Sequence, residues 1–159
     1  MLKTVIYIDA ANIILSAKDS SFDLDTMRLI QHLRDSCRDA HVIYFTGNFR
    51  SKRNEFDILT QSGVEMVYKE IYNEARKQKA NCDVEISHRI TSDILNGTVE
   101  NIILLSGDGD FACLYDFAYS KNIPVKAMAF DAASCSRMIK RRSFARVSYL
   151  SELGARIQK

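Results

Sequence analysis

The stretch that decides the fold is Ile102-Ile103-Leu104-Leu105-Ser106-Gly107-Asp108-Gly109-Asp110-Phe111. Its four leading apolar residues are typical of a strand that is buried on both faces of a sheet. The run then breaks at a Gly-Asp-Gly-Asp turn and continues into a helical pattern. The two carboxylates therefore follow the carboxyl end of a central strand, which is where open α/β sheets bind their ligands.

A second stretch, near the start of the chain, has the same design. Thr4-Val5-Ile6-Tyr7-Ile8-Asp9-Ala10-Ala11-Asn12 is an apolar strand that ends on an aspartate, and Asn12 follows three residues later. If the two strands are neighbours, Asp9, Asp108 and Asp110 converge at one edge of the sheet.

Strand patterns alternate with helical patterns along the rest of the chain. The predicted strands, including a short one at the sheet edge, are residues 4–9, 41–46, 64–68, 102–105, 123–130 and 147–150. The predicted helices are a short one after Asn12, one from an N-cap at Asp23 to residue 37, and those at 52–61, 84–95, 111–120 and 132–142. This order predicts a three-layer α/β/α sandwich around a mostly parallel sheet of five or six strands, as one domain over residues 1–159.

Composition narrows the class of protein. The chain has 159 residues, of which 47% are hydrophobic and 26% are charged, which suits a globular domain with a full core. No apolar run approaches a membrane span and the first residues lack a signal-peptide pattern, so a cytoplasmic protein is expected. The four cysteines show no C-x-x-C spacing, which disfavours a zinc site. A net charge of +2 permits a nucleic-acid partner without requiring one.

A fourth carboxylate, Asp83, lies where the basic segment 73–81 enters a helix. Helix dipoles favour aspartate in the first turn, and aspartate is common in turns, so capping and turn formation are the ordinary explanations for all four residues. If the four instead meet at one edge, their repulsion requires shared protons or a bound divalent ion. Oxygen ligands without histidine or cysteine favour Mg²⁺ or Mn²⁺ over Zn²⁺.

Three motifs, in this order and spacing, resemble the NYN domain, a PIN-like group that includes the LabA-like proteins. They are Tyr7-Ile8-Asp9-Ala10-Ala11-Asn12, Lys79-Ala80-Asn81-Cys82-Asp83-Val84 and Ser106-Gly107-Asp108-Gly109-Asp110-Phe111. The resemblance implies a PIN-like α/β fold and a metal-dependent ribonuclease. It also implies that Asp9, Asp83, Asp108 and Asp110 bind the metal, directly or through water, with Ser106 and Asn12 as supporting residues.

One position departs from the family pattern. Many members carry an aspartate six residues after the position of Asp83, where this chain has Arg89. Asp93 follows, but ten residues of helix span about 15 Å, so it cannot share an ion with Asp83. We expect Asp93 to pair with Arg89 at i,i+4. Two other roles stay open for Arg89: replacing part of the metal's charge, which would weaken or abolish activity, or binding a substrate phosphate.

Basic residues are the candidates for contact with nucleic acid. The substrate-binding candidates are Arg76, Lys77 and Lys79 in the segment beside Asp83, together with Arg89 and Ser106. For the further cations a solvated surface is the ordinary explanation; they are Lys52, Arg53, Arg137, Lys140, Arg141 and Arg142. Tyr72 and Phe49 are candidates for stacking on bases, although core packing explains an aromatic residue at least as well.

The sequence therefore favours an endoribonuclease that uses Mg²⁺ or Mn²⁺, with RNA as its partner; a homodimer is compatible with the sequence. The alternative is an inactive or weakened NYN module that binds RNA or a protein. A third interpretation, a phosphate-handling hydrolase of another Rossmann-like fold, is weaker. Aspartyl-phosphate phosphatases place Asp-x-Asp after the first strand, whereas Asp-Gly-Asp follows a late strand here.

Overall fold

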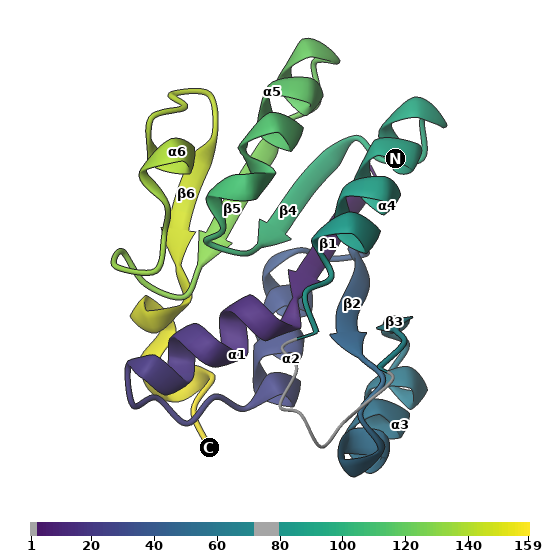
Figure 1. The fold of residues 1–159 in the computed structure, drawn as a ribbon, viewed down its shortest axis with the longest axis vertical. Helices are drawn as coiled ribbons and strands as arrows, with labels where there is room; N and C mark the ends of the chain where they lie inside the picture. The colour runs from purple at the N-terminus through teal and green to yellow at the C-terminus, as the bar shows by residue number, and fades with distance from the viewer. Residues whose placement is uncertain (1–2, 72–79) are drawn as a thin grey trace.

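Six parallel strands form one sheet in the computed structural model, which describes residues 3–71 and 80–159. The sheet order is β3-β2-β1-β4-β5-β6 (Figure 1), and every strand pairing in it is parallel. The strands are Thr4–Asp9 (β1), His41–Gly47 (β2), Glu65–Lys69 (β3), Asn101–Leu105 (β4), Val125–Ala129 (β5) and Arg146–Tyr149 (β6). The predicted α/β fold is confirmed, and the predicted edge strand is β6.

The strand order makes β1 and β4 direct neighbours. Ile8 pairs with Leu105, so Asp9 and Ser106 leave the sheet side by side. The chain runs outward from β1 to β3 on one side and from β4 to β6 on the other, so the pair β1–β4 is the topological switch point of the sheet. The carboxyl edge at such a point is the usual place for a ligand.

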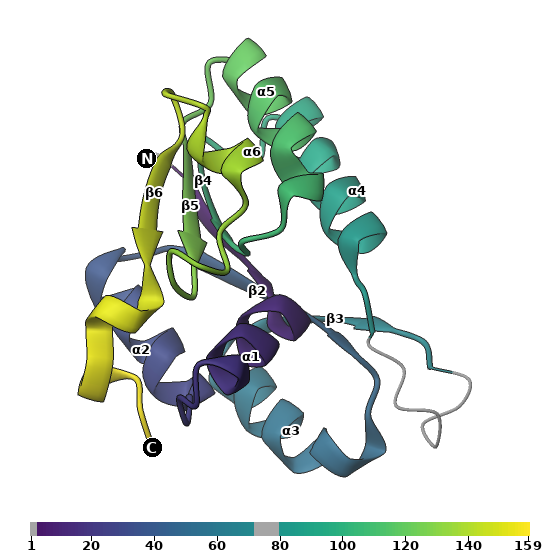
Figure 2. The same ribbon diagram turned by 60° about the vertical axis from the view of Figure 1, so that its left-hand side comes forward.

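Helices cover both faces of the sheet, as Figures 1 and 2 show together. One face carries Asp83–Leu95 (α4), Ala112–Ser120 (α5) and Arg137–Lys140 (α6); the other carries Ala10–Asp19 (α1), Thr26–Ser36 (α2), Arg53–Gln61 (α3) and the short helix Leu150–Arg156 (η4). The described residues also form two short 3-10 helices, Arg50–Lys52 (η1) and Gly109–Phe111 (η3). Alternate residues of β1 enter opposite cores, with Tyr7 on the α4 side and Ile8 on the α1 side. No helix in the described part of the chain is long and apolar enough to cross a bilayer.

Three predicted helix boundaries were wrong, each because a polar side chain caps the chain at another place. The first helix begins at Ala10, before Asn12, because the Asp9 carboxylate caps it. The cap of α2 is Asp25 rather than Asp23: its carboxylate accepts a hydrogen bond from the Arg28 N–H at 3.0 Å. The last helix is confined to Arg137–Lys140.

The shortening of α6 has a local cause in the chain that precedes it. The Ser134 N–H donates to the Asp131 carboxylate at 2.8 Å, and the Asp131 N–H donates to the Ser134 hydroxyl at 3.1 Å, which closes a turn. The Ser136 side chain then caps α6 by accepting from the Met138 N–H at 3.2 Å. Side chains that bond the nearby backbone compete with helix formation in this way.

Candidate metal centre at the carboxyl edge of the sheet

Three carboxylates meet at the carboxyl edge of the sheet. Asp83, Asp108 and Asp110 each place one oxygen within 4.8 Å of the others. Asp83 is the first residue of α4, whereas Asp108 and Asp110 come from the loop that follows β4, which includes the short helix η3. The prediction that distant parts of the chain bring aspartates together is therefore confirmed for these three.

The loop that carries Asp108 and Asp110 is held from two sides. The Gly107 N–H donates to the Asn12 side-chain oxygen at 3.0 Å, and the Gly107 carbonyl accepts from the Ser136 N–H at 2.9 Å. Within the loop, the Asp110 N–H donates to the Asp108 carboxylate at 2.9 Å. Turn formation and carboxylate clustering are thus both true of Asp108.

The two glycines of the motif are required by close approach of another segment. A Cβ on Gly107 would lie 2.2 Å from the Ser134 carbonyl oxygen, and one on Gly109 would lie 2.4 Å from the Ser136 hydroxyl oxygen. Both distances are far below van der Waals contact, so any side chain would push the loop away from residues 134–136. Together, the two glycines therefore fix the positions of the Asp108 and Asp110 carboxylates.

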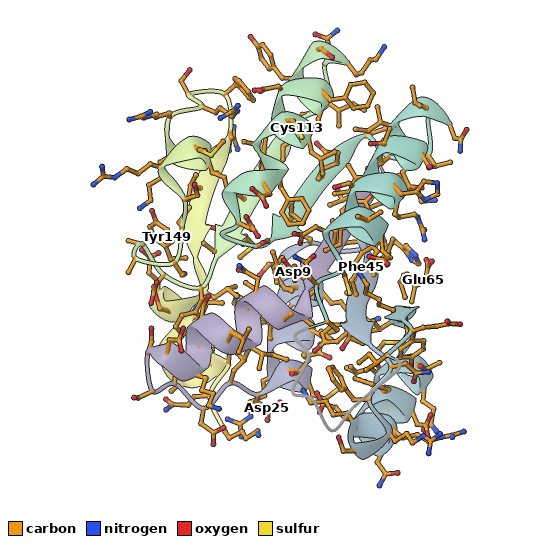
Figure 3. All side chains as sticks on the ribbon, viewed as in Figure 1. Asp9, Asp25, Phe45, Glu65, Cys113 and Tyr149 are labelled. Atoms are coloured by element: carbon orange, nitrogen blue, oxygen red, sulfur yellow. The ribbon has the colours of Figure 1, made fainter. Side chains whose placement is uncertain are left out.

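Asp9 is buried, with 4% of its surface exposed, and the charges of Asp83 and Asp108 act on it. Its carboxylate accepts from the Asn12 N–H at 3.3 Å and from the Ser106 hydroxyl at 3.0 Å. Burial raises the pKa of Asp9 to about 6; the two hydrogen bonds oppose this shift, and the charges of Asp83 and Asp108 add to it. Figure 3 shows Asp9 at the centre of the molecule. It is not one of the three grouped carboxylates, and its role as a ligand, directly or through water, stays a prediction.

Asp83 is positioned by residues that the sequence analysis did not select. Its N–H donates to the Asn81 side-chain oxygen at 2.8 Å, and the Lys69 ammonium donates to the Asn81 carbonyl at 2.5 Å. Burial raises the pKa of Asp83, and the charges of Asp108 and Asp110 act in the same direction, while Asn81 and Lys69 lower it. Lys69 also lies 3.7 Å from the Glu85 carboxylate. Because Lys69 ends β3 at the same sheet edge, the rule that pointed to Asp9 could have found it.

The donor set of the three aspartates fits a hard divalent cation. Two carboxylate charges 4.8 Å apart repel by about 3 kcal/mol at an effective dielectric constant near 20. In the described ranges, no lysine or arginine forms an ion pair with any of the three. Opposite ligands of Mg²⁺ lie about 4.2 Å apart, so small side-chain rotations would bring the oxygens into its coordination sphere.

Ser106 and Asn12 support the loop rather than contact a substrate. Ser106 is fully buried, and its hydroxyl both donates to Asp9 and accepts from the Asp108 N–H at 3.2 Å. The predicted substrate contact of Ser106 was wrong, because no surface of its side chain is accessible. Asn12 matches the supporting role that was predicted for it, since its amide oxygen holds Gly107.

Arg89 is not at the carboxylate group. Its Nε donates to Asp93 at 2.9 Å, which confirms the predicted i,i+4 pair, and its terminal nitrogens donate to both oxygens of Glu65. Six residues of helix separate Arg89 from Asp83 by about 9 Å, and Figure 3 shows Glu65 well apart from Asp9. The suggestion that Arg89 neutralises the aspartates was wrong, because Glu65 and Asp93 occupy its guanidinium. Its binding to a substrate phosphate stays a prediction.

Five further residues were predicted to contact the substrate. Arg76, Lys77, Lys79 and Tyr72 lie outside the described residues. Phe49 is partly buried against the core on the α1 side, so its aromatic ring is explained by packing.

Fold and site together define a PIN-like α/β protein with an acidic group at the switch point of its sheet. The family model of the NYN domain matches residues 3–146, and the chain belongs to the NYN domain family, which is generally nuclease-like. The crystal structure of a protein of unknown function from Vibrio parahaemolyticus is similar, with a TM-score of 0.75, 18% sequence identity, and coverage of 99% of this chain and 96% of that one. At that identity the likeness concerns the fold. No curated protein matches the chain.

Proposed function

We propose that the protein is a metal-dependent endoribonuclease that hydrolyses RNA phosphodiester bonds with Mg²⁺ or Mn²⁺. The observation that supports this most is the meeting of Asp83, Asp108 and Asp110 within 4.8 Å, on a fold of the NYN family. These three residues would hold the ion, and Asp9 would bind it directly or through a water molecule.

The residues around the group have separable tasks in this proposal. A bound divalent ion acidifies water and offsets the charge of a phosphodiester. Asn12 and Ser106 hold the loop of Asp108 and Asp110 in place, and Asn81 holds the start of α4. A site fixed in this way needs little rearrangement when its ligand arrives, which is the condition for electrostatic catalysis.

A circular single-stranded RNA tests the proposal, because only internal cleavage can linearise it. We expect cleavage with Mn²⁺ or Mg²⁺, none with EDTA, and a loss of more than about 100-fold in Asp108→Asn. Asparagine keeps the acceptor that caps η3, so this variant should fold. The matched control is Asp57→Asn, an exposed aspartate on α3. Equal cleavage by wild type and Asp108→Asn would remove the proposal.

The alternative is a module that binds RNA or a protein without cleaving. Arg89 was the feature in its favour, and its bonds to Glu65 and Asp93 take that support away. Calorimetric titration with Mn²⁺ separates the two functions. Absence of ion binding at millimolar concentration, with RNA binding retained, would favour the module.

A further inference from the structure

The helix α6 lies directly against the loop that carries the carboxylates. A Cβ on Gly109 would lie 3.2 Å from the Met138 sulfur, and the Ser136 N–H donates to the Gly107 carbonyl. In spite of this contact, 52% of Met138 is exposed. An accessible apolar side chain therefore borders Asp108 and Asp110.

The same short helix and the two residues that follow it carry four cations, which are used unequally. The Lys140 ammonium donates to the Ala132 carbonyl at 2.6 Å, and Arg142 donates two hydrogen bonds of 2.7 Å to Asp116. Arg137 and Arg141 are exposed, and no residue in the described part of the chain is a side-chain partner for either. Two of the four cations are thus explained by structure and two are left over.

The two unused arginines share one side of the helix. Residues at i and i+4 are surface neighbours, with Cβ atoms about 5–6 Å apart. Met138 and Arg142 form the adjacent pair, which faces Gly109 and Asp116. The helix dipole does not explain why residue 137 is a cation, because Arg137 is the first residue of α6 and the dipole disfavours positive charge at a helix start.

We infer that α6 is a binding surface for single-stranded RNA next to the carboxylates, with Arg137 and Arg141 on backbone phosphates and Met138 against a base. The inference rests on the proposed function and names the surface that brings its substrate to the site. Three aspartates repel a polyanion, so RNA needs fixed cations close by in order to approach them. Guanidinium groups bind phosphate with paired hydrogen bonds. A single strand is required, since a base must leave its partner to reach a side chain.

Binding is measured without cleavage, by fluorescence anisotropy of a labelled single-stranded 12-nucleotide RNA in EDTA, with all variants made in Asp108→Asn. We expect Arg137→Gln with Arg141→Gln to weaken binding about tenfold and to lower the slope of log affinity against log salt by about 1.4, or 0.7 for each lost phosphate contact. Met138→Ala should weaken binding without changing that slope.

The matched control is Arg38→Gln with Lys121→Gln, which removes the same charge. Both residues are exposed and precede strands, Arg38 before β2 and Lys121 before β5, so they lie at the opposite sheet edge. We expect this pair to bind RNA as the parent does. An equal loss in control and test variants, or no loss in the test variant, overturns the inference. So does tighter binding of a duplex RNA than of the single strand.

Failure of this surface and failure of the nuclease proposal give different results. If the variant Arg137→Gln with Arg141→Gln, made with Asp108 intact, cleaves circular RNA as well as the wild type does, the nuclease proposal stands and the proposed surface is refuted. A protein that binds RNA through these arginines, and cleaves none with any ion, keeps the surface and refutes the nuclease.

Discussion

At the scale of single residues, Ser106 shows why the motif needs particular small side chains. Its hydroxyl donates to the Asp9 carboxylate and accepts from the Asp108 N–H, in a position with no exposed surface. A hydroxyl can donate and accept at once, which alanine cannot do. Ser106 is therefore the direct link between the aspartate that ends β1 and the loop that follows β4.

Ser106→Ala should lower the free energy of unfolding by about 1–3 kcal/mol, because it leaves a buried carboxylate oxygen and a backbone N–H without a partner. Urea denaturation followed by circular dichroism measures this loss. The comparison variant is Ser51→Ala, whose side chain is exposed on η1. A Ser106→Ala protein as stable as the Ser51→Ala protein would show that the link contributes nothing.

Gly107→Ala should weaken Mn²⁺ binding, because the added Cβ would meet the Ser134 carbonyl and displace the carboxylate loop. Calorimetry gives the affinity. Gly97→Ala separates this effect from general damage: Gly97 has a φ of +64° with nothing near its Cβ position, so alanine strains the backbone away from the site. Gly97→Ala should lose stability and keep its affinity. Unchanged affinity in Gly107→Ala would mean that the close approach does not position the ligands.

At the scale of elements, α4 performs two tasks at two places along its length. Its first residue, Asp83, belongs to the acidic group. Its middle is fastened to the sheet through Arg89, which bonds Glu65 at the start of β3, and through Asp93, which accepts from the buried Tyr7 hydroxyl at 2.8 Å. The arginine that departs from the family pattern thus helps to seat the helix that carries Asp83.

Arg89→Gln should lower the free energy of unfolding by about 1–3 kcal/mol while leaving RNA cleavage intact below the unfolding temperature. The loss arises because Glu65 and Asp93 keep their charges and lose their shared partner. Thermal unfolding and the circular-RNA assay measure the two effects on one preparation. A large drop in cleavage at unchanged stability would instead place Arg89 among the substrate contacts.

The pair Arg89–Glu65 also predicts a dependence of stability on pH. Hydrogen bonds from Arg89 lower the pKa of Glu65 to about 2, from an ordinary value of 4.5; burial opposes this shift, and the bond to His41 adds to it. Since the pKa is lower in the folded protein, the stability from this carboxylate is present above pH 4.5 and is lost as the pH falls toward 2. The melting temperature should fall in that window, and fall less steeply in Arg89→Gln. Parallel curves for the two proteins would contradict the assignment.

At the scale of the whole molecule, the fold could be predicted because runs of apolar residues in the sequence mark the buried strands. The apolar run at 102–105 and its counterpart in β1 are buried on both faces, and both end on the acidic edge. The meeting of the aspartates followed from the strand ends, but two other contacts between distant residues carried no such signal. Nothing in the spacing of Arg89 points to Glu65, 24 residues away, and the pinning of Gly107 by Ser134 depends on a turn that no periodicity marks.

The two apolar cores lie on the two faces of the sheet, and the acidic group lies at its edge, in neither core. The packing of the two cores therefore supplies the stability that holds three like charges together. In the protein without an ion, the repulsion between these charges lowers the free energy of unfolding. Any change that removes one of these charges and keeps the shape should stabilise the ion-free protein. The same change should reduce what an ion can add.

Asp110→Asn is the most direct test of these two effects, higher stability without an ion and a smaller gain with one. Asp110 is exposed, and its carboxylate has no hydrogen-bond or ion-pair partner in the described ranges. Without an ion, the variant should melt higher than wild type, by about 2–4 °C for each kcal/mol of repulsion removed. With Mn²⁺ at 100 times its dissociation constant, wild type should gain about 2.7 kcal/mol, and the variant less. Asp57→Asn should change neither value. If Asp110→Asn melts no higher without the ion and gains as much with it, the three carboxylates do not act as one cation site.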